Sequence, residues 1–133
     1  MLLLDTDVLS ALRRPDRAPN VRAWLANQNE SDLYLSVITL GEIERGIAQQ
    51  RSRDPAFADD LQAWVDGSVT LFADRILPFG SAEARIWGRL SAEIGNTSAD
   101  LMIAATGLAV GATVVTGNIR HFQPTGVPTV DPF

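Results

Sequence analysis

Short apolar runs alternate along this chain with longer segments in which apolar residues recur every three or four positions. The runs predict buried strands at residues 1–4, 33–38, 76–78, 112–116 and 128–130. The longer segments predict helices at residues 8–12, 19–28, 40–50, 55–67 and 86–94, and one more that begins after Thr97 or Ser98. Strands that alternate with helices indicate an α/β fold whose central, mostly parallel sheet is covered on both faces.

Several helix and strand boundaries carry their own signals. Asp54 and Pro55 predict a helix start, with Asp as the N-cap and Pro in the first turn. Gly67 predicts the end of that helix, because glycine favours the position after a last turn. Pro78 lacks an N–H donor, so the strand before it is expected at an edge of the sheet.

Residues 101–119 contain no charged side chain, which is close to the ~20-residue length of a membrane span. The stretch also contains three glycines and three threonines, and it ends in a turn-like sequence around Asn118. We therefore interpret it as a buried helix, a turn and a buried strand, and expect no membrane association.

The composition excludes several kinds of chemistry. The 133 residues carry a net charge of −5, all 11 basic residues are arginine, cysteine is absent and His121 is the only histidine. Lysine-based and thiol-based catalysis, P-loops and two-histidine zinc motifs are thereby ruled out. The length predicts a single domain, 1–133, and nothing at its start resembles a signal peptide, so we expect a cytoplasmic protein.

Three acidic residues stand in apolar surroundings close to the ends of predicted strands. Asp5 follows the first strand, Glu42 lies early in the helix after the second, and Asp100 lies in the first turn of the uncharged helix. Each has an ordinary explanation as a helix cap, a solvated helix residue or a partner of the helix dipole. Carboxyl ends of parallel strands meet at one edge, however, and converging carboxylates favour a hard divalent cation, Mg²⁺ or Mn²⁺. Such a site would support metal-assisted hydrolysis of a phosphodiester.

Three segments resemble, in order, the motifs of PIN-domain ribonucleases, and more narrowly of VapC-type toxins from bacterial toxin–antitoxin pairs. They are Leu3–Ser10, Thr39–Gly46 and Ala99–Thr106. The resemblance implies a three-layer α/β/α sandwich and a Mg²⁺- or Mn²⁺-dependent endoribonuclease. It implies Asp5 and Asp100 as metal ligands, and Glu42 as a third acid that binds metal directly or through water, or orients the attacking water. It also implies an RNA substrate, a cognate antitoxin and a homodimer.

The last motif departs from the family pattern. Thr6 and Thr116 match hydroxyl positions near the site, and Asn118 and Phe122 are retained. The usual arginine is Gly117 and the usual acid is His121, which puts a second metal ion in doubt. His121 is open to three interpretations: a solvated residue, a contact to phosphate or proton carrier, or, least favoured by magnesium's preference for oxygen, a metal ligand.

Other features leave alternatives open. The Asp5-Thr6-Asp7 sequence also resembles the nucleophile motif of haloacid-dehalogenase phosphatases, although those enzymes usually need a lysine or arginine and a larger chain. The altered last motif is compatible with a non-catalytic binding module. Arg13, Arg14 and Arg17 form either a rim that contacts RNA phosphates or a solvated basic turn.

Overall fold

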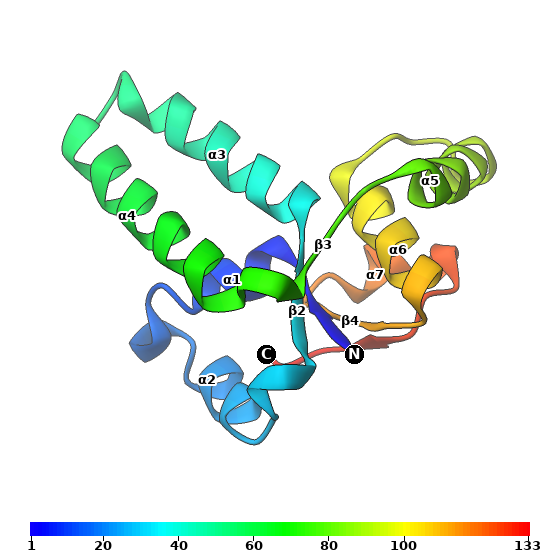
Figure 1. Ribbon diagram of the computed structural model, residues 1–133, viewed down its shortest axis with the longest axis horizontal. Helices are drawn as coiled ribbons and strands as arrows, with labels where there is room; N and C mark the ends of the chain where they lie inside the picture. Colours follow the sequence, from blue (N-terminus) through cyan, green and yellow to red (C-terminus); the bar gives the residue numbers. More distant parts are fainter.

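A five-stranded sheet with every neighbouring pair parallel forms the middle of the computed structural model, which describes residues 1–133 (Figure 1). The strands are β1 (Leu2–Leu4), β2 (Leu33–Ser36), β3 (Ile76–Leu77), β4 (Thr113–Val115) and β5 (Thr129–Val130). Their order is β3-β2-β1-β4-β5. The predicted parallel sheet is confirmed, and β3, the strand before Pro78, lies at an edge as expected.

Helices cover both faces of this sheet. They are α1 (Thr6–Ala11), α2 (Pro19–Ala26), α3 (Val37–Arg51), α4 (Pro55–Phe72), α5 (Ser81–Ile94), α6 (Ala99–Val110) and α7 (Ile119–Phe122). Short 3₁₀ turns lie at Pro15–Arg17, Glu30–Asp32, Ala73–Arg75 and Gln123–Thr125. Figure 1 shows α3 and α4 as a hairpin that projects from one side, while α5 and α6 pack together on the other.

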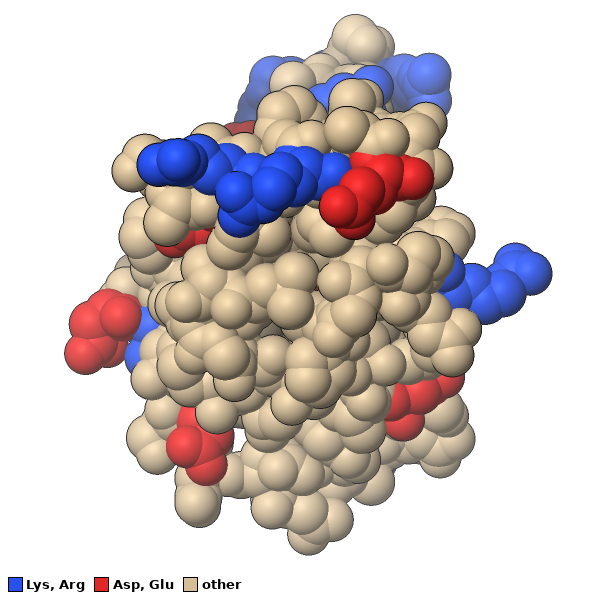
Figure 2. Space-filling model, turned by 90° about the vertical axis from the view of Figure 1, so that its right-hand side faces the viewer, with Lys and Arg blue, Asp and Glu red and all other residues tan.

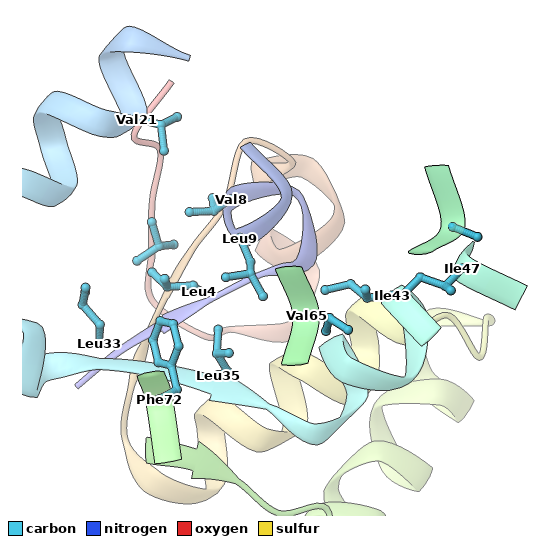
Figure 3. Packing of buried hydrophobic residues seen from close by; sticks show 12 residues of the cluster. Leu4, Val8, Leu9, Val21, Leu33, Leu35, Ile43, Ile47, Val65 and Phe72 are labelled. Carbon is cyan, nitrogen blue, oxygen red and sulfur yellow. The ribbon is translucent and has the colours of Figure 1, made fainter. Parts of the chain in front are cut away.

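The alternation of side chains along the strands divides the core into two halves. Leu4 and Val115 belong to a buried cluster with α1, α3 and α4 (Figure 3), whereas the preceding residues Leu3 and Val114 pack with α6 and α7. Successive strand residues point to opposite faces, so each strand supplies both halves. The predicted three-layer α/β/α arrangement is therefore confirmed.

The prediction that Gly67 ends the fourth helix is wrong, because α4 continues to Phe72. Gly67 costs roughly 1 kcal/mol of helix propensity relative to alanine. Phe72 is only 5 % exposed in the core, and burying such a side chain contributes roughly 1.5–3 kcal/mol. The helix ends instead at Ala73, whose φ is 39°. Asp54 caps α4 as predicted, its side chain accepting a hydrogen bond from the Phe57 N–H at 3.1 Å.

The uncharged stretch folds as interpreted, into α6, a turn and β4. Ser98 occupies the N-cap position of α6, one of the two predicted candidates, although its side chain makes no capping hydrogen bond. No helix in the structure combines the length and the apolar character that crossing a membrane requires.

Replacing glycine by alanine is expected to have opposite effects on stability at two helical positions. A Cβ on Gly107 of α6 would lie 3.2 Å from both Val114 and Val127, which are buried, whereas Gly88 on exposed α5 has open space around it. We expect Gly107→Ala to destabilise the protein by about 1 kcal/mol through overpacking. Gly88→Ala should stabilise it by roughly 0.5–1 kcal/mol. Urea unfolding of both variants measures the difference, and an equal shift in the two would contradict the tight packing of α6 on the sheet.

Candidate active site

The order of the strands reverses beside β1, and the candidate site lies at that point. From β1 the chain builds outward through β2 and β3, while β4 and β5 lie on the other side of it. Crevices at the carboxyl ends of strands beside such a reversal are the usual ligand sites of parallel sheets. Asp5 and Thr116 are the first residues after β1 and β4, and the Asp5 N–H donates to Val115 O at 3.0 Å.

Asp5 is a buried carboxylate whose side chain is 2 % exposed. One oxygen, Oδ1, accepts from the Val8 N–H at 2.9 Å, so Asp5 does cap α1. Burial raises its pKa to about 6, and the charges of Asp7 and Asp100 add to the increase, while the Thr116 hydroxyl and the Val8 N–H oppose it. The capping role and a role in the site coexist, because the cap engages only one oxygen.

Thr6 connects α1 to Glu42 on α3. Its hydroxyl donates to Glu42 Oε1 at 2.5 Å and lies 3.1 Å from the Thr39 hydroxyl. Glu42 is exposed at the edge of the site and is held by this hydrogen bond, not by an ion pair with Arg45. The structure thus places Thr6 and Glu42, both candidate site residues, in contact with each other.

Asp100 and His121 meet on the other side of Asp5. His121 Nδ1 lies 2.8 Å from Asp100 Oδ2, and the imidazole is 59 % exposed while the Asp100 side chain is 25 % exposed. Asp100 is in the first turn of α6, and His121 is on the short helix α7. His121 is therefore solvated, as one interpretation held, but it also contacts a predicted site carboxylate.

Asn118 forms hydrogen bonds to two residues beside Asp5. Its backbone N–H donates to Thr116 Oγ1 at 2.9 Å, and its side-chain Nδ2 donates to Asp7 Oδ2 at 2.6 Å. The sequence interpretation named Asp7 only as part of the Asp5-Thr6-Asp7 motif and did not include it among the candidate site residues. The available signal was its position two residues after Asp5, on the first turn of the helix that Asp5 caps.

The donor set fits a hard divalent cation. No three Asp, Glu or His side chains stand together as a ready-made ligand set. Asp5 and Asp100 are nevertheless close enough for the charge of one to raise the pKa of the other. Magnesium commonly binds through one or two carboxylates and keeps several waters, so a pair of acids such as Asp5 and Asp100 fits its preferences.

Three surface hollows surround these residues. A groove of about 410 Å³ between α1, α3 and α4 contains Thr6, Glu42 and Arg13, and the Arg13 guanidinium lies 5.1 Å from the centre of the Phe57 ring. A second hollow, also of about 410 Å³, includes Asp7 and Asn118. A third, of about 380 Å³, includes Asp100 and His121. Asp5 itself is buried and lines none of the three hollows.

Known proteins are similar to this chain in sequence and in fold. The family model described as "PIN domain" matches residues 2–126. The VapC ribonuclease Y4jK of Sinorhizobium fredii is 34% identical over 142 residues, which cover 100% of this chain and 98% of that protein. The toxin FitB of Neisseria gonorrhoeae is 32% identical over 140 residues, covering 100% of this chain and 99% of that protein. The crystal structure of FitAcB from Neisseria gonorrhoeae has a TM-score of 0.85 and 34% identity, covering 99% of this chain and 98% of that one.

Proposed function

We propose that this chain, which belongs to the PIN-domain family, is a metal-dependent endoribonuclease and the toxin of a toxin–antitoxin pair. The observation that carries the proposal is the buried Asp5 carboxylate at the reversal of the strand order, with Asp100 beside it. Burying an isolated carboxylate costs free energy unless a positive charge compensates it. The names of the ribonuclease and toxin relatives support the same activity.

Asp5 and Asp100 would hold Mg²⁺ or Mn²⁺, with Glu42 as a direct ligand or as a ligand through water. A divalent cation supplies positive charge that makes a nearby water more acidic and stabilises the charge on the phosphate oxygens. A neighbouring cation would also lower the pKa of Asp5 from about 6, because an opposite charge favours the ionised form. Oxygen donors alone are consistent with these metals and unfavourable for softer ones.

Glu42 is the group placed to accept a proton during the reaction. Thr6 fixes one of its carboxylate oxygens and leaves the other free at the exposed edge of the site. In hydrolysis, water adds to phosphorus, the bond to one ribose oxygen breaks, and the departing ribose oxygen takes up a proton from the solvent. Glu42 would receive the proton that the attacking water loses, acting as a general base.

The other predicted site residues would position these groups. Thr116 directs its hydroxyl to Asp5, and Asn118 holds both Thr116 and Asp7. His121 would orient Asp100 through the contact between Nδ1 and Oδ2. Arg13 lies in the same groove as Glu42, where its guanidinium can contact an RNA phosphate.

Cleavage of RNA with defined metal contents tests this function. We expect the purified chain to cut a labelled single-stranded RNA internally with millimolar Mg²⁺ or Mn²⁺, and to stop when excess EDTA is present. Cleavage that persists in EDTA would contradict the metal dependence. A phosphorylated Asp5 formed from a phosphate ester would favour the haloacid-dehalogenase reaction, and absence of metal binding at millimolar concentration would favour a non-catalytic module.

The partners follow from the same family membership. We propose a cytoplasmic protein that forms a homodimer and whose site is covered by an antitoxin protein. The α5–α6 side offers one surface for self-association, because Figure 2 shows its middle free of charged side chains. Residues 101–119 and 121–130 contribute no acidic residue, lysine or arginine. Light scattering tests whether the protein is a dimer, because the measured mass should then be twice the 14.4 kDa of one chain.

A further inference from the structure

The hollow beside Asp7 has a composition that the proposed hydrolysis does not explain. It is lined by Asp7, Ser10, Gly117, Asn118 and Phe133, and its volume is about 410 Å³. Asp7 and Asn118 connect it to Asp5 through Thr116. A group seated in this hollow would therefore lie next to the reacting centre.

Phe133 presents an aromatic ring to this hollow and is 50 % exposed. Its backbone is fixed at two points: the N–H donates to Asp131 Oδ1 at 2.8 Å, and the carbonyl oxygen accepts from Asn20 Nδ2 at 2.8 Å. The ring packs directly on Gly117, since a Cβ there would come within 2.8 Å of ring atom Cδ2. Glycine at position 117 thus makes the space that the ring occupies.

The lining excludes some ligands and favours others. None of its five residues is cationic, and the Asp7 carboxylate would repel a phosphate. The exposed aromatic residue Phe133 favours a flat, neutral aromatic group, because stacking of a nucleobase on such a side chain contributes roughly 1–3 kcal/mol. Asp7 Oδ2 is engaged by Asn118, which leaves Oδ1 and the Ser10 hydroxyl to accept from base N–H groups at the rim.

We propose that this hollow is a nucleobase subsite in which Phe133 stacks on an unpaired base of the RNA substrate. The proposal rests on the proposed ribonuclease function and deepens it, since a base inside a duplex is already stacked on both faces and cannot seat here. Phe133 is the residue that determines the preference for an unpaired base, and Gly117 positions its ring.

Steady-state cleavage of a short single-stranded RNA by four variants tests the subsite. Phe133→Ala should raise KM about 5- to 100-fold, the range that one stacked base contributes, and leave kcat within about 2-fold. Gly117→Ala keeps the ring but displaces it and should raise KM in the same direction. Phe133→Trp should restore a KM near that of the unmodified chain. Val69→Ala, at a 40 % exposed apolar residue on α4 that lines none of the hollows around the site, is the matched control and should change neither constant.

Direct binding separates failure of the subsite from failure of the ribonuclease function. Fluorescence anisotropy in EDTA should show weaker binding of the same RNA to Phe133→Ala and Gly117→Ala, and circular dichroism verifies that both variants are folded. An unchanged KM and unchanged binding in both variants would overturn the subsite, even if the unmodified chain cleaves RNA. Equal affinity for the same sequence in a duplex would overturn it as well. If the unmodified chain binds RNA through Phe133 but never cleaves it, only the ribonuclease function fails.

Discussion

Replacing Asp5 by Asn is expected to eliminate RNA cleavage and, at the same time, to stabilise the metal-free protein. The substitution removes the charge on which metal binding depends and keeps the size and shape of the side chain. Asn is also a good N-cap residue, so the hydrogen bond from the Val8 N–H to position 5 is retained. We expect activity in Mg²⁺ to fall by at least about 100-fold, the scale seen when a group that stabilises the transition state is lost.

The gain in stability depends on pH in a defined direction. In the unfolded chain an aspartate has a pKa near 3.9, whereas burial raises the pKa of Asp5 to about 6 in the folded protein. The fold therefore favours protonated Asp5, and its ionisation destabilises the folded state. The penalty is absent below about pH 4, grows between pH 4 and 6, and is constant above that at roughly 3 kcal/mol. Asn carries no such penalty at any pH.

Urea unfolding in EDTA at pH 4 and at pH 7.5 measures this difference. The Asp5→Asn variant should be more stable than the unmodified chain at pH 7.5, and the two should converge at pH 4. Asp54→Asn is the matched control, because Asp54 also caps a helix but is exposed; its effect should stay within about 0.5 kcal/mol at both values of pH. Lower stability of Asp5→Asn at pH 7.5, or cleavage in Mg²⁺, would contradict the assignment.

The local pattern of the sequence was sufficient to predict the layers of the fold and where two candidate site residues lie along it. Consecutive apolar residues such as Leu3 and Leu4 indicate a strand that is buried on both faces. The positions of Asp5 and Asp100 beside predicted strands and helices follow from the same local pattern. The order of the strands was not predicted. The pairing of β1 with β4 joins residues more than 100 positions apart, and no local periodicity encodes which strands become neighbours.

Side-chain contacts across long separations account for most of what the sequence left open. Asn118 contacts Asp7 across 111 positions, and no local pattern in the sequence predicts that contact. Phe133 contacts Gly117 through a conformation of the last residues that carries no periodic signal. Gly67 shows the opposite failure, in which a local signal was present but burial of Phe72 outweighed it. Tertiary packing overrides propensity in that case.

Replacing Asp100 by Asn is expected to reduce cleavage by about 100-fold or more, and the double variant with Asp5→Asn should be no worse than the more impaired single variant. Groups that act as one catalytic unit have strongly non-additive effects, because losing either one already disables the unit. Asp5 and Asp100 meet this condition if they hold the same cation, and the influence of Asp100 on the pKa of Asp5 is consistent with that arrangement.

Mn²⁺ titration followed by electron paramagnetic resonance provides a readout that does not depend on cleavage. Each single variant should bind Mn²⁺ at least about tenfold more weakly, the lower end of what loss of even an outer-shell partner produces. Asp60→Asn, an exposed acid on α4, is the control for the loss of one negative charge and should bind normally. If the reductions in cleavage of the two single variants multiply in the double variant, Asp5 and Asp100 act independently. The two carboxylates would then serve different ions or different steps.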